Sequence, residues 1–305
     1  MQSSLATREC WQGGLPCVFA LHPDEVTTLQ KPRPYTMVLP RQSLLPFVTE
    51  TVRKHFMPFG PPMGGELWFE AGGEALRWQI PIGVLFDILA GEEAAVAGAA
   101  LPWRITVHFQ AFPAELLQAT QSEAEAVLLN ALKESSFLMC GSAMPAMSLT
   151  PASQRILATA LSIPDADLTK AYESYAAIAA LIDTAVRAQL GAGAAAADGS
   201  GESPPALAPV RAVPLRVFVS TAEWRQQPLP PIRASDGEPT TLLDALNLTL
   251  PTHFDAASGG ADGGGPCVLV QGVRCPLHTP LHWLHAACAH PDGWLYVSVS
   301  VPTTD

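Results

Sequence analysis

The feature that most constrains the fold of this 305-residue chain is an order of sequence patterns that occurs twice, once near each end. Each copy reads as two strands, a helix, a strand, a helix and a strand, because short alternating or apolar runs are separated by segments with helical spacing. This is the element order of a β-grasp, or ubiquitin-like, module. We therefore expect two such domains with separate modest cores rather than one large core.

The first copy is expected to occupy residues 11–113. Apolar or mixed runs at 17–21 and 35–39 predict strands, and helical spacing within 43–56 predicts a helix. Glycines between Ala71 and Glu74 supply the positive φ that a tight turn needs, which predicts a hairpin there. The large aromatic and apolar side chains of this region are expected to form the core rather than a ligand pocket; they are Trp68, Phe69, Trp78 and Trp103.

The middle of the chain is rich in alanine, leucine and glutamate, which predicts a helix-rich domain at 114–190. Within it, Thr150-Pro151 offers a cap followed by proline at the first helical position, where its missing N–H costs nothing. A further helix is expected from 165 to 190. Residues 191–213 are mostly alanine, glycine, serine and proline, and they are expected to form a flexible linker to the second β-grasp domain at 214–305.

Composition restricts the possible partners and the compartment. A formal net charge of −11 argues against a surface for nucleic acid or for anionic lipid, since both require clustered lysine and arginine. Six scattered cysteines and an N-terminus without an apolar secretory segment predict reduced thiols in a cytoplasmic protein. No apolar run reaches the roughly 18 residues of a membrane span. Contact with membranes is therefore expected to come through partners.

The densest group of metal-ligating side chains lies between residues 275 and 290. Spacings of three and four would place His278, His282 and His285 on one helical face if the helix began early enough. Proline at positions 276 and 280 interrupts the first turn, so we favour a partly exposed helix without a metal. A metal-dependent enzyme is the weaker alternative, and it depends on this group alone.

No other pattern indicates chemistry on small molecules. The glycine-rich segment 259–265 lacks the lysine and hydroxyl residue of a phosphate-binding loop, and no serine-nucleophile motif is present. Cys140 lies beside Gly141-Ser142, but a reactive thiol needs a nearby base or cation, and only Lys133 is close in sequence. We therefore expect no catalytic residue and no cofactor.

A dense series of motifs fills the block from Glu66 to Pro113, and related motifs occur at Leu39-Pro40-Arg41 and Thr279-Pro280-Leu281. The motifs of the block are Trp68-Phe69-Glu70, Pro81-Ile82-Gly83, Leu85-Phe86-Asp87, Leu101-Pro102-Trp103 and Ile105-Thr106-Val107-His108-Phe109. In their content and spacing they resemble the autophagy protein 5 family. The resemblance implies an α+β protein with a short N-terminal helix at 1–10 and two ubiquitin-like domains that flank a helix-rich domain, which agrees with the patterns.

The resemblance also implies a function. Family members are non-catalytic scaffolds that pair with autophagy proteins 12 and 16, engage the conjugating enzyme of autophagy protein 8 and promote its lipidation at preautophagosomal membranes. Pro40 and Arg41 are expected to border the groove for the N-terminal helix of autophagy protein 16, with Arg41 placed to meet an external carboxylate. A helix-capping or solvated role for Arg41 is an equal alternative. The alternative function is a ubiquitin-like interaction module with a partner outside autophagy.

One residue of the family pattern is missing. Family members accept autophagy protein 12 on a lysine just after the long helix of the helical domain, and here that position holds Met144, or Met139 in an ungapped alignment. No lysine lies between Lys133 and Lys170. An isopeptide bond requires an amine, so we expect non-covalent pairing through adaptable side chains at Met139, Met144 and Met147. Lys133 as a substitute acceptor, or a Met144 introduced to block conjugation, remains an alternative.

Overall fold

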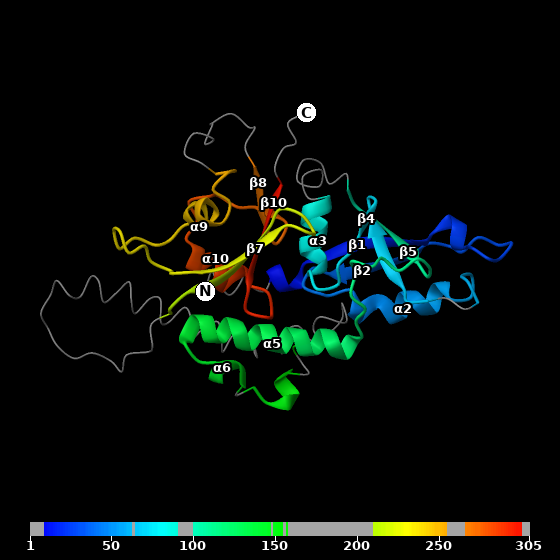
Figure 1. Cartoon of the computed structure of the whole chain (residues 1–305), viewed down its shortest axis with the longest axis horizontal. Helices are drawn as coiled ribbons and strands as arrows, with labels where there is room; N and C mark the ends of the chain where they lie inside the picture. The colour runs from blue at the N-terminus through cyan, green and yellow to red at the C-terminus, as the bar shows by residue number, and fades with distance from the viewer. Residues whose placement is uncertain are drawn as a thin grey trace, which may run out of the picture.

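A computed structural model describes residues 9–62, 65–90, 100–147, 149–154, 157, 210–254 and 266–300. Two five-stranded mixed sheets lie side by side, and a long helix runs beneath both of them in the view of Figure 1. Each sheet belongs to one β-grasp domain, so the predicted α+β architecture is confirmed. Within the described ranges, no helix has both the length and the apolar character needed to cross a bilayer.

The first sheet has the strand order β2-β1-β5-β3-β4. Its central strands β1 and β5 are parallel, and the remaining neighbours are antiparallel. Gly72 and Gly73 have φ values of 61° and 86°, so the predicted glycine turn of the hairpin is confirmed. The strands are β1 (Gly14–Leu21), β2 (Tyr35–Pro40), β3 (Trp68–Ala71), β4 (Glu74–Ala75) and β5 (Trp103–His108).

Two helices, α2 (Pro46–Phe56) and α3 (Ile82–Leu89), share one core with this sheet. The predicted helix begins at Pro46, three residues later than expected, because proline suits the first helical turn, where its missing N–H costs nothing. Phe69 and Trp103 are buried, as predicted, whereas Trp68 and Trp78 are half-buried at the edge of the core. A short 3-10 helix, η1 (Pro23–Glu25), follows β1.

The second sheet repeats this pairing with the order β7-β6-β10-β8-β9, and its central strands β6 and β10 are again parallel. Gly237 has a φ of 77° in the turn after Asp236, a backbone conformation that favours glycine. Val213 already belongs to β6, one residue before the expected start of the second domain at 214. The elements are β6 (Val213–Phe218), β7 (Trp224–Leu229), α9 (Leu242–Thr249), β8 (Cys267–Val270), β9 (Val273–Arg274), α10 (Leu281–Cys288) and β10 (Leu295–Ser300).

The helix-rich part is described in its first half. Helix α5 (Gln121–Cys140) begins at a reciprocal capping box between Thr120 and Glu123, and the short helix α6 (Met144–Met147) follows it. The predicted cap at Thr150 is confirmed, because its hydroxyl accepts a hydrogen bond from the Ser153 amide at 3.1 Å. Residues 9–12 are helical. The rest of the N-terminal helix, the helix expected at 165–190 and most of the linker lie outside the described residues.

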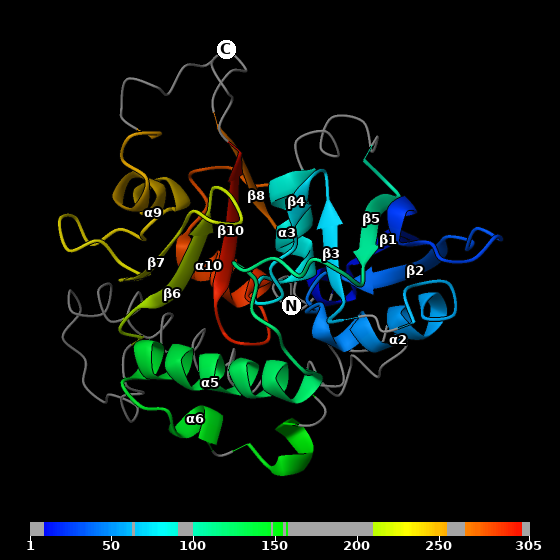
Figure 2. The ribbon, with the colours of Figure 1, turned by 45° about the vertical axis from the view of Figure 1, so that its right-hand side comes forward.

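Helix α5 packs against both ubiquitin-like domains, as Figures 1 and 2 show from two directions. Ala124 and Leu128 pack against Leu44 and Phe47 of the first domain. Toward the second domain, Ala131 belongs to the same buried apolar cluster as Trp294, and two hydrogen bonds add to this packing. The Trp294 indole donates to the Ala131 carbonyl at 3.3 Å, and the Ser135 hydroxyl donates to the Asp292 carbonyl at 2.7 Å. The helix therefore joins the two sheets.

A buried carboxylate organises the loop between α10 and β10. The Asp292 carboxylate accepts hydrogen bonds from the Trp294 amide at 3.0 Å and from the Tyr296 hydroxyl at 2.7 Å. Burial alone would raise the pKa of Asp292, but His290, Arg216 and Tyr296 hold it below its usual value. The neighbouring His290 donates from Nε2 to the carbonyl of Gln42 in the first domain at 2.8 Å. The loop therefore connects all three parts of the chain.

Two glycines of the second domain allow a matched test of how the loop between α10 and β10 docks on α5. Gly293 and Gly237 have φ values of 79° and 77°, but a Cβ at 293 would collide with the Ser135 side chain, whereas one at 237 meets nothing within 4 Å. Gly237→Ala should cost about 1–2 kcal/mol for the left-handed backbone. Gly293→Ala should cost about 1–3 kcal/mol more, because α5 must move away. Urea unfolding measures both, and equal losses would contradict this docking.

Candidate functional site

A cavity of about 800 Å³ opens between the two ubiquitin-like domains. The first domain contributes Gly13 and Arg41 to its lining, and β9 and α10 of the second domain contribute the opposite side. Two apolar side chains there are open to solvent: Val273 is 67% exposed and Trp283 is 43% exposed. We call this cavity the interdomain groove. Its surface offers apolar contact to a partner together with polar groups around it.

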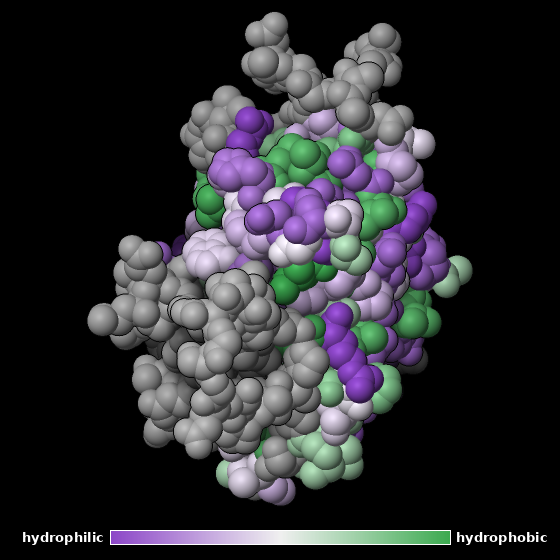
Figure 3. Space-filling view, turned by 90° about the vertical axis from the view of Figure 1, so that its left-hand side faces the viewer, coloured by the Kyte–Doolittle hydropathy of each residue, from purple (hydrophilic) through white to green (hydrophobic). Residues whose placement is uncertain are grey.

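Apolar surface is not confined to the interdomain groove. Figure 3 shows the side of the molecule that carries the second domain, where apolar patches lie between polar ones. On α9, Leu248 is 61% exposed, which is close to the exposure of Val273. Exposure alone therefore does not identify a binding surface. The groove combines exposed apolar side chains with a volume of about 800 Å³, compared with about 360 Å³ for the hollow lined by the exposed Val127 and Trp224.

Arg41 forms the floor of the groove and does not project into solvent. Its guanidinium makes hydrogen bonds of 2.6 Å to both carboxylate oxygens of Asp87 and one of 3.1 Å to the Gly83 carbonyl, and its side chain is only 10% exposed. The carboxylate that pairs with Arg41 thus belongs to the same chain, so the expected external carboxylate and the solvated alternative are both wrong for the free chain. Its Nε is buried and has no hydrogen-bond partner among the described residues.

The same contact reaches the second domain. The Gly272 amide, in the turn between β8 and β9, donates to the Asp87 carboxylate. A Cβ at Gly272 would lie 2.9 Å from the guanidinium carbon of Arg41, so only glycine permits this approach. Burial raises the pKa of Asp87, and Arg41 and the Gly272 amide counteract the shift. Loss of one partner of such a buried pair typically costs about 3–5 kcal/mol, so this floor should be rigid.

Two thiols lie at the edge of the groove, where Cys10 and Cys288 approach to 3.8 Å between their sulfur atoms. A hydrogen bond from Cys288 lowers the pKa of Cys10, although burial opposes this shift. All six cysteines are free thiols, as the sequence predicts. Burial raises the pKa of Cys140, which supports the interpretation of this residue as an inert thiol.

The histidines of the 275–290 segment do not converge on one point. His278 precedes α10, whereas His285 is only 1% exposed and donates from Nε2 to the Gly293 carbonyl at 2.8 Å. Burial lowers the pKa of His285. Helix α10 is partly exposed, as expected: Trp283 is 43% exposed, whereas His285 lies on the buried face that packs under β10. Among the described residues, the group of three potential ligands that does converge lies elsewhere, at His22, Glu25 and His108.

Two family models match this chain. The model "Autophagy protein ATG5, UblA domain" matches residues 10–109, and the model "Autophagy protein ATG5, UblB domain" matches residues 212–299. Together they cover more than half of the sequence, one on each β-grasp domain. The chain belongs to the autophagy protein 5 family.

Individual members of the family give the same result. Autophagy protein 5 of Neosartorya fischeri is 27% identical over 344 residues, and the alignment covers 98% of this chain and 96% of that protein. The rice protein is 36% identical over 157 residues, which cover 51% of this chain but only 40% of the rice sequence. The crystal structure of Kluyveromyces marxianus Atg5 has the same fold, with a TM-score of 0.69 at 18% identity over 97% of this chain and all of that one.

The methionines at the end of α5 differ in exposure. Met139 is fully buried, so it is neither an acceptor position nor part of a surface, and the expectation that it contacts a partner is wrong because its helical position faces the core. Met144 and Met147 are 62% and 61% exposed. Phe137, which the sequence reasoning missed, is 56% exposed and lies one helical turn after the exposed Lys133. An aromatic residue on the polar side of α5 was the signal that could have revealed it.

Proposed function

We propose that this member of the autophagy protein 5 family is a non-catalytic scaffold. It joins autophagy proteins 12 and 16 into a ligase-like complex that promotes the lipidation of autophagy protein 8. The observation that carries the proposal is the interdomain groove, a concave apolar site between two domains that both match the family. The protein acts in the cytoplasm and reaches preautophagosomal membranes through these partners, without binding nucleic acid or a cofactor.

The groove suits an amphipathic helix such as the N-terminal helix of autophagy protein 16. Such helices place apolar side chains at successive turns into a hydrophobic groove. Val273 and Trp283 offer the apolar surface, and Arg41 lies at the floor. Because both domains contribute to the lining, the site depends on their fixed arrangement, and a partner helix that binds there stabilises the same arrangement.

The exposed methionine surface suits a second partner. Phe137, in the last turn of α5, and Met144 and Met147 of α6 are exposed apolar side chains near the position where family members carry the acceptor lysine, and we assign them to autophagy protein 12. Without a covalent link, the complex loses an effective concentration of roughly a millimolar. The contact surfaces must then bind more tightly by several factors of ten, each equivalent to about 1.4 kcal/mol. Flexible methionine side chains are well suited to such a contact.

Substitution in the groove tests the proposed binding of the N-terminal helix of autophagy protein 16. Val273→Asp should weaken binding of the N-terminal peptide of autophagy protein 16 at least tenfold, because the complex would bury an unpaired carboxylate. Leu248→Asp is the matched control, since Leu248 has similar exposure outside the groove and its substitution should change affinity less than twofold. Isothermal titration calorimetry measures both. Equal affinities for the two variants would place the helix elsewhere.

Placing a lysine at the acceptor position tests the proposed non-covalent pairing with autophagy protein 12. With the cognate activating and conjugating enzymes, Met144→Lys should form an adduct with autophagy protein 12 that survives a denaturing gel and reductant, since it supplies a nucleophile at the family position. The wild-type chain should form a complex only under native conditions. Met147→Lys is the matched control, because its exposure is the same within 1% and it lies outside the acceptor position.

A denaturation-resistant adduct of the wild-type chain would contradict non-covalent pairing. Lys133 is exposed and is the alternative acceptor, so Lys133→Arg then identifies the linkage. Loss of the adduct in that variant would show conjugation through Lys133.

A further inference from the structure

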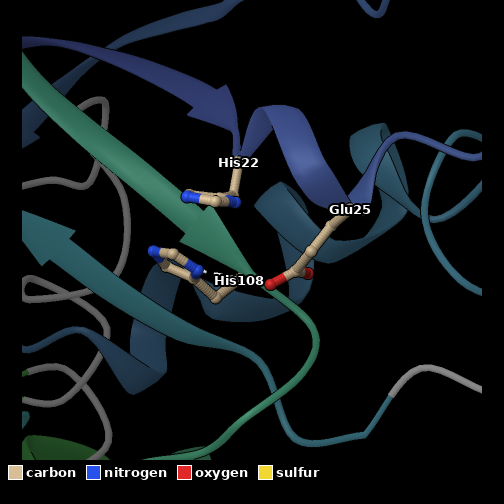
Figure 4. Close-up of side chains that lie close together, drawn as sticks. All are labelled: His22, Glu25 and His108. Atoms are coloured by element: carbon tan, nitrogen blue, oxygen red, sulfur yellow. Dashed lines mark hydrogen bonds and ion pairs between the residues drawn. The ribbon is translucent and has the colours of Figure 1, made fainter.

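Three side chains with metal-binding groups converge at one end of the first sheet, far in sequence from the histidines discussed above. His22 follows β1, Glu25 lies in η1, and His108 ends β5 (Figure 4). The parallel register pairs Leu21 with Val107, so the next residues of the two strands, His22 and His108, become neighbours. One ligand atom from each of the three residues lies within 4.8 Å of the other two.

The surroundings of His108 favour a cation. Its Nδ1 lies 3.2 Å from Glu25 Oε1, and its Nε2 lies 3.2 Å from Glu70 Oε2 without the alignment of a hydrogen bond. A neutral imidazole carries one N–H, so it leaves one lone pair facing a carboxylate oxygen. Glu25 and His108 are each only 6% exposed, where an unpaired charge is costly. A cation at the Nδ1 side removes this conflict.

The ligand atoms are held in place before any metal arrives. The second oxygen of Glu25 accepts a hydrogen bond from the Phe109 amide, which directs Oε1 toward His108. The Trp68 indole stacks on the His108 ring at 3.9 Å and 10°, which fixes the orientation of the ring. Glu70 Oε2 lies 3.2 Å from Nε2, close enough that a small rotation would let it accept a hydrogen bond, which is the carboxylate–histidine arrangement that commonly supports a metal-binding imidazole.

We propose that His22, Glu25 and His108 bind one zinc ion, with water in the fourth position. Two imidazoles and one carboxylate are a ligand set typical of zinc. Tetrahedral bonds of about 2.05 Å place ligand atoms roughly 3.3 Å apart, so the group must contract. His22 supplies this movement: its ring stacks on His108 at 4.7 Å and 29°, it is half-buried, and it makes no capping hydrogen bond. The zinc ion ties η1 to the ends of two central strands.

Titration of the chelator-treated, full-length protein with Zn²⁺, and with Co²⁺ as a spectroscopic probe, tests this site. We expect one equivalent of metal with a micromolar or tighter Kd, together with a rise in Tm. His22→Ala should weaken binding at least tenfold, and Glu70→Gln should weaken it about 10–100-fold by removing the support of His108. His278→Ala is the control, because His278 is an exposed histidine of the other domain, and it should leave the affinity unchanged.

His22→Ala is expected to remain folded, which far-ultraviolet circular dichroism verifies before titration. Absence of binding by the wild-type chain at 100 µM Zn²⁺ (about 100 times a micromolar Kd) would overturn the proposal. Equal weakening by His278→Ala, or a thiolate-to-cobalt charge-transfer band from the cysteines, would also overturn it. Cobalt spectra of nitrogen and oxygen ligands that disappear in His22→Ala would support it.

Discussion

The Asp87 carboxylate lies between the two ubiquitin-like domains, held by Arg41 from its own domain and by the Gly272 amide from the other. A charge that is only 3% exposed is stable only while both neighbours remain in place. Separation of the domains would leave the carboxylate with fewer donors, and the floor of the interdomain groove would be lost at the same time. The shape of the proposed binding site therefore depends on this contact.

Other buried polar contacts also hold the two domains together. His290 reaches the Gln42 carbonyl across the domains, and the loop around Asp292 and Trp294 is hydrogen-bonded to α5. Buried hydrogen bonds of this kind require one relative position of the domains, because a shift would leave a buried donor or acceptor without its partner. They add to apolar contact between the domains, because Phe218, Trp294 and Tyr296 of the second domain belong to the same core as the first sheet, and the second sheet has a further core of its own.

The sequence was sufficient for the local elements but not for the contacts between them. The repeated strand and helix order, the glycine turn at Gly72 and the cap at Thr150 follow from nearby residues, and the structure agrees. The pairing of Arg41 with Asp87, 46 residues away, depends on how α3 meets the end of β2. His108 joins His22 only through the parallel register of β1 and β5.

Helical phase explains the remaining errors. Met139 and Met144 were equivalent candidates in the sequence, yet α5 turns the first toward the core and ends before the second. His278, His282 and His285 would share one helical face only if the helix began early, but α10 begins at Leu281, after His278, and buries His285. Which face a helix buries is decided by its tertiary partners, and these partners come from segments distant in sequence.

Native-state hydrogen exchange across a denaturant series tests the central claim that the desolvated contacts make the domains one cooperative unit. The slowest amides of β1 and β5 and those of β6 and β10 should open with the same free energy and the same denaturant dependence. If one sheet opens at a clearly lower free energy while the other stays protected, the domains are independent, and a groove that requires both of them would not be a preformed site.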